Sequence, residues 1–411
     1  MKKNKNNDII QAVKNRRKNM KDYWEEPTQK KVNKKKIIFV SITVIALIAI
    51  ITVALIYYNH KPVREWIDKY IFRKEVMQDK VSTIELKENE NTNIHAFNKY
   101  IGVLNKNQFI IYGNTGNEEK KLEVQISSPI FDSANRFLVM AEKKGKKAYL
   151  ITDKDITWET EVEGNIAQVH VNKNGYVAIV ITDTSHKTVI AMYNPEGKEM
   201  FKTYLASTRT ADVAISNDNK HLAIAEVDTS GTMIQSNIKI ISIEKASSDP
   251  TNSLENTYKG EADKLITNIT YQDRNKLVCM YTDCLHIIEN KEDKLLMDNE
   301  NKKMIFQSVE LTNNAIGIEE KSSGLFTADS VVTIINTENK NTKQYTVNAV
   351  AKEIYTYGNR IALNLGTEIE FISTDGWLVK RYVANQEITN IVMSENMAGI
   401  IYRDKIEIIN L

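Results

Sequence analysis

The chain has 411 residues, 42% of them hydrophobic, which is enough to bury one large core. Its formal net charge is +2, but residues 1–36 hold thirteen lysines and arginines against four acids, so this tail carries +9 and the remainder −7. Two cysteines in a chain of this length exclude a small domain built on disulfides. A basic tail on a mildly acidic body indicates a nucleic acid or a membrane surface as its partner.

The segment after the tail decides in favour of a membrane. Residues 37–58, IIFVSITVIALIAIITVALIYY, form an uncharged run of 22 that would span about 33 Å as a helix, the thickness of bilayer hydrocarbon. A cleaved signal peptide has a shorter apolar region of about 7–15 residues. We therefore predict an uncleaved signal anchor that crosses the membrane once. Because the basic residues precede it, we expect residues 1–36 to be a disordered cytoplasmic tail, with no nucleic acid partner.

Residues 59–81 are predicted to form a juxtamembrane helix or stalk. Apolar and aromatic side chains recur there at helical spacing: Val63, Trp66, Ile67, Tyr70 and Ile71. Tryptophan and tyrosine are common at the level of the lipid headgroups, so this helix would lie at the interface or continue the anchor.

From about residue 82 onward, short β-branched runs separated by turn residues replace the helical pattern. A unit of turn and apolar strand occurs eight times, at intervals of 36 to 55 residues, and each strand is marked by a small or apolar residue: Gly102, Leu138, Ala178, Ala223, Val278, Gly317, Ala362 and Gly399. An asparagine three or four positions earlier marks each turn, where a tight hairpin needs positive φ: Asn98, Asn135, Asn174, Asn219, Asn275, Asn314, Asn359 and Asn396.

Four strands in every 40 residues or so are the pattern of propeller blades. Residues 82–411 are therefore predicted to be an all-β domain, an eight-bladed β-propeller, with seven blades as the alternative. The last unit has only three strands, whereas Thr83–Lys87 precedes the first unit as a spare strand. We expect this N-terminal strand to complete the last blade and close the ring, which removes exposed strand edges.

The repeats at Val189–Leu205 (VIAMYNPEGKEMFKTYL) and Ile369–Val383 (IEFISTDGWLVKRYV) resemble those of quinoprotein-like and WD40-like propellers. Trp158 falls where such repeats often have an aromatic residue. The arrangement is similar to an uncharacterised family of membrane-anchored propeller-like proteins of Gram-positive bacteria, with a domain of unknown function. The Gly-His and Trp-Asp dipeptides of WD40 blades are absent, and four tryptophans are too few for the tryptophan-docking motif of quinoproteins. No cofactor is expected.

No motif for catalysis or phosphate binding occurs, so we do not expect an enzyme. In LVCMYTDCLHIIE a two-residue turn would place Cys279 opposite His286 and Cys284 opposite Tyr281. Buried thiols, a diagonal disulfide and a metal site are the alternatives, and the metal site is disfavoured because zinc takes four ligands. No metal is expected. The other histidines are scattered and are expected to be structural, without a carboxylate and a nucleophile beside them: His60, His95, His170, His186 and His221.

Two loops between second and third strands are longer than the others and place bulky apolar residues after a Ser-Gly pair. One contains Gly231, Met233 and Ile234, and the other contains Gly324, Leu325 and Phe326. We predict that they form a partner-binding site on one rim of the propeller. The alternative is that both are long hairpins folded over their own blades. The insertion at Lys245–Gly260 is expected to be a solvated loop on the opposite face.

The predicted function is a non-catalytic interaction or scaffold domain, tethered at the outer side of a bacterial cytoplasmic membrane. Its partner would be an envelope protein or a cell-wall component. One alternative is a sensor that signals through the cytoplasmic tail. Another is a propeller enzyme, such as a quinone-cofactor dehydrogenase or a glycan lyase.

Overall fold

The computed structural model describes residues 10–15, 34–60, 63, 64, 66, 67, 81–86, 92–272, 276–299, 303–324 and 327–411. The chain divides into two units, Met1–Glu65 and Trp66–Leu411.

The first unit contains one long helix, α2 (Lys34–Asn59). Of this helix, Phe39–Asn59 is long and apolar enough to cross a membrane, and its side chains are exposed. Two of its polar side chains return hydrogen bonds to the helix itself, since Thr43 Oγ1 donates to Phe39 O (2.9 Å) and Thr52 Oγ1 donates to Ile48 O (2.8 Å). These bonds satisfy both hydroxyl groups within the helix.

The two predictions that flank this helix are only partly visible. In the tail, residues 10–15 are helical rather than disordered, and residues 34–36 belong to α2; the rest of the tail lies outside the described residues. In the juxtamembrane stretch, residues 63, 64, 66 and 67 are helical, and residues 61, 62, 65 and 68–80 lie outside the described part.

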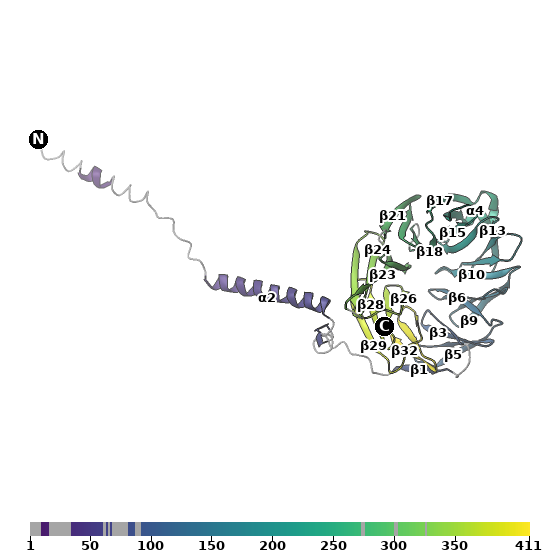
Figure 1. The fold of residues 1–411 in the computed structure, drawn as a ribbon, viewed down its shortest axis with the longest axis horizontal. Coiled ribbons are helices and arrows are strands. Elements are labelled where there is room, and N and C mark those ends of the chain that lie inside the picture. Colours follow the sequence, from purple (N-terminus) through teal and green to yellow (C-terminus); the bar gives the residue numbers. More distant parts are fainter. Residues whose placement is uncertain are drawn as a thin grey trace. The chain divides into compact units, whose positions relative to one another are not determined.

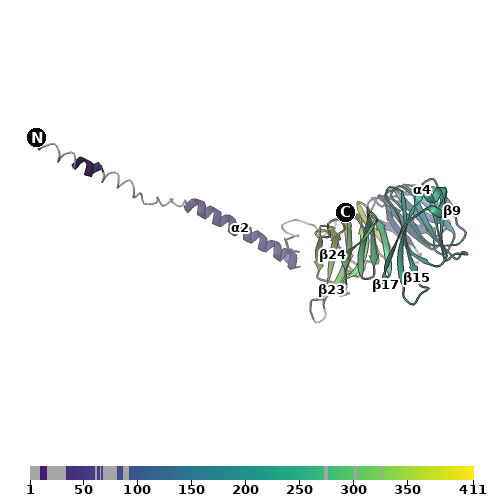
Figure 2. The same cartoon turned by 90° about the horizontal axis from the view of Figure 1, so that it is seen from above.

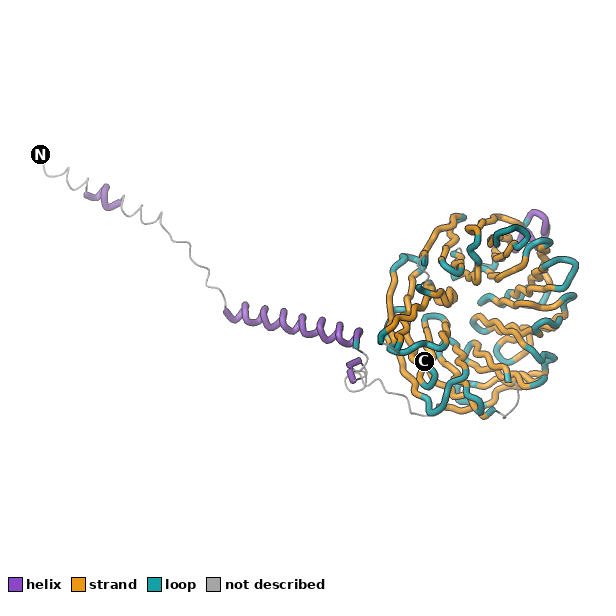
Figure 3. Tube along the Cα trace, in the orientation of Figure 1, coloured by secondary structure: helices purple, strands orange, loops and turns teal. Residues whose placement is uncertain are grey.

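The second unit consists of eight antiparallel four-stranded sheets, which are the blades of a propeller (Figures 1 and 3). The blade count is therefore eight rather than seven. In blades one to seven, the strands follow one another in the chain, from the innermost strand at the axis to the outermost strand at the perimeter.

The first four blades have the following strands. Blade one comprises β2 (Asn93–Phe97), β3 (Tyr100–Asn105), β4 (Gln108–Tyr112) and β5 (Glu118–Glu123). Blade two comprises β6 (Pro129–Ala134), β7 (Phe137–Glu142), β8 (Lys147–Thr152) and β9 (Asp155–Glu161). Blade three comprises β10 (Asn165–Val171), β11 (Val177–Thr182), β12 (Thr188–Tyr193) and β13 (Glu199–Leu205). Blade four comprises β14 (Arg209–Ile215), β15 (His221–Asp228), β16 (Gln235–Ser242) and β17 (Leu254–Ala262).

The other blades continue the pattern. Blade five comprises β18 (Ile266–Tyr271), β19 (Leu277–Tyr281), β20 (Cys284–Glu289) and β21 (Glu292–Asp298). Blade six comprises β22 (Ile305–Leu311), β23 (Asn314–Ser322), β24 (Ala328–Asn336) and β25 (Thr342–Val347). Blade seven comprises β26 (Glu353–Tyr357), β27 (Arg360–Asn364), β28 (Glu368–Ser373) and β29 (Leu378–Val383). Blade eight comprises β30 (Asn390–Met393), β31 (Met397–Ile401), β32 (Lys405–Asn410) and β1 (Ser82–Glu85).

The N-terminal strand closes the ring, as predicted. β1 pairs antiparallel with β32, with Ser82 opposite Ile408 and Glu85 opposite Lys405. Ile84 is 3% exposed and packs in one cluster with residues of the first and last blades. Closure thus joins the two ends of the propeller through a strand ladder and through a shared apolar core.

The small residues of the repeat have a packing reason. A Cβ on Gly102 would lie 2.0 Å from Phe109 Cζ, one on Gly317 would lie 2.4 Å from Met304 Sδ, and one on Gly399 would lie 2.7 Å from Ile101 Cδ1. A large side chain from a neighbouring segment occupies the space, so these strands need a residue without a side chain. The repeated glycine or alanine therefore marks close packing.

Positive φ in the first turn of the blades occurs at three of the eight predicted asparagines: Asn98 (49°), Asn135 (55°) and Asn219 (60°). In three other blades the residue beside the predicted asparagine adopts it instead: Gly175 (83°), Asn313 (50°) and Gly358 (57°). Asn396 does not have positive φ, and Asn275 lies outside the described residues. The asparagines mark the turns correctly, but in three blades the residue with positive φ is the neighbour of the predicted asparagine.

The insertion in blade four is folded, which corrects the expected solvated loop at Lys245–Gly260. It begins with a short helix, α4 (Ile243–Ser248), whose N-cap Ser242 accepts a hydrogen bond from Lys245 N. Ile243 and Ala246 are buried. A 3₁₀ turn, η1 (Pro250–Asn252), then leads into the outer strand β17.

Candidate functional site

The two long hairpins that the sequence singles out extend beyond the same face of the propeller, at the ends of β15 and β23 (Figure 2). We call this the hairpin face. The opposite face carries the turns between first and second strands and helix α4, and we call it the turn face. Met233 is 58% exposed and Ile234 is 41% exposed, so neither packs under its own blade. Gly231 and Gly324 are also exposed, whereas Leu325 and Phe326 lie outside the described residues.

Hydrogen bonds within each loop stabilise the ends of both hairpins. In the first, the Asp228 carboxylate accepts hydrogen bonds from Ser230 N (2.9 Å) and Ser230 Oγ (2.6 Å). In the second, Ser323 N and Gly324 N donate to Thr327 O at 3.0 and 3.2 Å. The first hairpin has exposed apolar side chains beyond this polar base, a combination typical of contact surfaces.

Sequence reasoning missed a second site, in the central channel. A cavity of about 360 Å³ lies in the half of the channel next to the turn face. Its walls run from Asp132 and Asp212, in the middle of inner strands, to Asn172, Asn217 and Gly358 at the turns. The cavity is thus at the opposite end of the propeller from the exposed residues of the hairpin face.

Bulges in the inner strands prepare the polar wall of this channel. In β10, β14, β18 and β22 the register shifts by one residue just before a polar side chain, namely Gln168, Asp212, Asn268 and Ser308. A bulge re-aims the residues that follow it. Several of these side chains bond to a neighbouring blade: Gln168 Nε2 donates to Ala211 O (2.8 Å), Asn268 Nδ2 donates to Asp212 Oδ2 (2.9 Å), and Ser308 Oγ lies 2.9 Å from Thr356 Oγ1.

Two buried aspartates link neighbouring blades through backbone hydrogen bonds. Asp132 Oδ2 accepts from Val171 N (2.7 Å) in the next blade and its Oδ1 accepts from Ser133 N (2.8 Å). Asp212 Oδ2 accepts in the same way from Ile269 N (2.8 Å). Burial nevertheless raises the pKa of each carboxyl group to about 6, against these hydrogen bonds, which lower it. Burial and the Asp132 charge also raise the pKa of Glu310 in the same cavity.

Two histidines adjoin this wall: His170 has a carboxylate beside it, and His95 has a serine hydroxyl. His170 Nε2 lies 3.3 Å from Asp212 Oδ1, and burial lowers the pKa of His170 although Asp212 opposes the shift. His95 Nε2 lies 2.9 Å from Ser133 Oγ, and burial lowers its pKa to about 4. Chemically, the channel wall can gain protons at Asp132 and Asp212 near pH 6. Among the described residues, no group of three His, Cys, Asp or Glu side chains is arranged to hold a metal ion.

The cysteine hairpin has the predicted register, with Cys279 opposite His286. Both cysteines are fully buried and free, so of the three alternatives the buried thiols are found. Burial raises the pKa of Cys279, and it raises that of Cys284 to about 12. His286 Nδ1 instead pairs with Asp293 Oδ1 at 2.9 Å.

Solved structures share the fold at very low sequence identity. Sqt1 of Chaetomium thermophilum, solved with the N-terminus of ribosomal protein L10, is 8% identical with a TM-score of 0.51 over 81% of this chain and 100% of its own. BamB of Moraxella catarrhalis is 12% identical with a TM-score of 0.49 over 81% and 100%. The dihydro-heme d1 dehydrogenase NirN is 10% identical with a TM-score of 0.46 over 81% and 72%.

The likeness to Sqt1 shows the propeller fold alone. A comparison with curated proteins gives no significant match. The model of one family, described as a family of unknown function, DUF5711, matches residues 73–411, which is the whole propeller. The chain belongs to the family DUF5711.

Proposed function

We propose that this protein is a membrane-tethered, non-catalytic interaction domain, with α2 in the cytoplasmic membrane and the propeller on its outer side. Its partner is an envelope protein or a cell-wall component. The observation that carries the proposal is helix α2, whose 21-residue stretch Phe39–Asn59 is apolar and exposed. Exposed apolar area costs about 25 cal/mol per Å² in water, so a helix that is apolar all round requires lipid.

The direction of insertion follows from charge. Thirteen lysines and arginines against four acids precede the helix, and such basic segments stay on the cytoplasmic side. The propeller, which follows the helix, would then lie outside. Its contact surface would be the hairpin face, where Met233 and Ile234 are exposed.

Site-directed labelling with a membrane-impermeant maleimide tests the location. The wild-type chain is a silent background, because both native cysteines are fully buried and their raised pKa values disfavour the reactive thiolate. Single cysteines are placed at two exposed positions, Ala12→Cys in the tail and Ser248→Cys at the end of α4. In intact cells we expect S248C to be labelled and A12C to be labelled only after permeabilisation.

Two controls make the result decisive. Each variant is labelled again in detergent, where both positions must react, and the membrane fraction must retain the protein after an alkaline wash. Labelling of A12C but not S248C in intact cells would reverse the orientation. A chain that appears in the soluble fraction would contradict the anchor itself.

A further inference from the structure

A second cavity, between blades four and five, has the features of a small-molecule site. It has a volume of about 260 Å³ and lies on the turn face, next to the channel cavity. Tyr271 lines both cavities, so they share a wall. This volume is slightly below the range of roughly 300–1,000 Å³ that is usual for drug-sized ligands, so the crevice suits a single ring rather than an extended molecule.

The floor is apolar and the walls are aromatic. The buried floor consists of Ile240, Leu277 and Ile288, all less than a tenth exposed, and the partly exposed Tyr258 and Tyr271 complete the lining. Among the described residues, neither tyrosine hydroxyl has a hydrogen-bond partner, although each can donate one hydrogen bond and accept another. Unpaired hydroxyl groups above an apolar floor favour a ligand that has both C–H and O–H surfaces.

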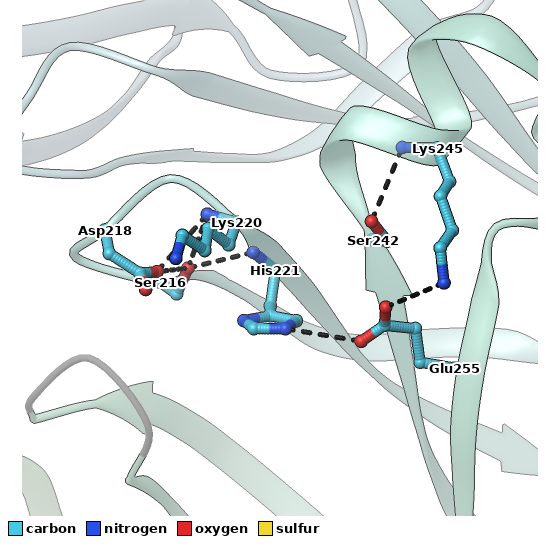
Figure 4. A network of polar contacts seen from close by, with 7 residues as sticks. All are labelled: Ser216, Asp218, Lys220, His221, Ser242, Lys245 and Glu255. Carbon is cyan, nitrogen blue, oxygen red and sulfur yellow. Dashed lines mark hydrogen bonds and ion pairs between the residues drawn. The ribbon is translucent and has the colours of Figure 1, made fainter.

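On one side of the rim, a carboxylate is paired with two basic side chains (Figure 4). The Glu255 carboxylate lies 3.3 Å from His221 Nε2 and 3.2 Å from Lys245 Nζ, so bases already surround it. Ser216 Oγ fixes the turn before His221, since it accepts from His221 N (2.9 Å) and donates to Asp218 Oδ1 (2.8 Å). This side of the rim is therefore built in advance, and its carboxylate is already paired.

The opposite rim supplies further polar groups. Asn290 and Lys291 form the turn between β20 and β21, both with positive φ (52° and 66°), which holds them at the edge of the crevice. Asn256, on β17, lies across from them in the lining. Amide and ammonium groups at this edge can bond to hydroxyl groups of a neutral ligand.

We propose that this crevice binds one pyranose ring of a neutral saccharide. The apolar floor and tyrosine rings would receive the C–H face of the ring, while the tyrosine hydroxyls and the rim would bond its hydroxyl groups. The site lies on the turn face and is independent of the contact surface proposed on the hairpin face. It stands or falls separately from the membrane anchor.

The test uses the full chain in a zwitterionic detergent without sugar headgroups. Saturation-transfer NMR is recorded with glucose, galactose and N-acetylglucosamine, with sorbitol as an acyclic control of similar hydroxyl content. We expect transfer to at least one of the three sugars and none to sorbitol. The double variant Y258F/Y271F keeps both rings and loses both hydroxyls, so its affinity should fall about 3- to 10-fold or more, as expected for lost hydrogen bonds.

Two further variants keep the result interpretable. N256A changes a partly exposed residue of an outer strand and should weaken binding even if the double variant fails to fold. Y204F, at a tyrosine that is 54% exposed on blade three, should leave affinity unchanged. The proposal is overturned if no sugar receives saturation, if sorbitol receives as much, or if folded Y258F/Y271F and N256A both bind like the wild type.

Discussion

At the scale of single residues, buried polar groups in the channel wall link neighbouring blades. Asp132 and Asp212 each accept backbone hydrogen bonds across a blade boundary, and in return they are held in a wall that raises their pKa values to about 6. Their signal in the sequence is one acidic residue in each inner strand, within PIFDSA and RTADVAI. It was missed because each blade contributes only one or two such residues, and only ring closure brings them together.

These shifts predict how stability changes with pH. A carboxyl group whose pKa is about 6 when folded and 3.8 when unfolded stabilises the fold as the pH falls from about 7 towards 4, because the native state takes up the proton first. A histidine whose pKa is about 4 when folded and 6.5 when unfolded has the opposite effect over a similar range. In the wild type Asp132 and His95 therefore partly cancel.

Single variants should separate the two effects. Thermal unfolding midpoints of the full chain are measured at pH 7, 6 and 5. In His95→Gln the midpoint should fall less on acidification than in the wild type, or should rise. In Asp132→Asn, which also loses one acceptor, the midpoint should be lower throughout and should fall more steeply. Parallel profiles for all three proteins would show that these groups do not titrate as described.

At the scale of elements, the sequence predicts the strands well, but it predicts the exact turn positions and the short helix α4 poorly. Alternation and small residues locate the blades, because each small residue faces a large neighbour, as Gly102 faces Phe109. Positive φ moves by one residue in some turns, since glycine or a second asparagine stands beside the predicted one. Helix α4 escaped prediction because six residues are too few to show a helical period, and its stability comes from the cap at Ser242 and the buried Ile243.

The closing strand gives a test at this scale. Ile84 is 3% exposed and packs between the first and last blades, whereas its neighbour Thr83 is exposed. Ile84→Ala in the full chain should lower the free energy of unfolding by about 2–4 kcal/mol, as usual for a buried isoleucine. Thr83→Ala is the matched control and should change it by less than about 0.5 kcal/mol. Equal effects of the two substitutions in denaturant unfolding would mean that β1 does not close the ring.

At the scale of the whole propeller, the two faces differ in chemistry. The hairpin face has apolar side chains on an extended loop, whereas the channel cavity and the crevice between blades four and five both lie on the turn face. A sequence can mark the long loops, because their length and composition are local. It cannot place cavities, whose walls come from strands of several blades. The two faces can therefore serve two partners of different size.

The hairpin face is tested by photo-crosslinking in intact cells from a photoreactive residue at position 232, beside Met233 and Ile234. If these two are anchors in a contact, a discrete adduct should form. The adduct should decrease more than 10-fold in M233S/I234S, since such anchors are each worth about 1–2 kcal/mol or more. The variant should unfold at the wild-type temperature, because both side chains are exposed and contribute little to the core.

The matched control is a Trp377→Ser chain that carries the same photoreactive residue at position 232. Trp377 is 54% exposed in the turn between β28 and β29, on the turn face, so its loss should leave the adduct unchanged. An adduct that persists in M233S/I234S, or one that decreases equally in W377S, would show that Met233 and Ile234 are not the anchors of the contact. A variant M233S/I234S that unfolds at lower temperature would make these residues part of the core.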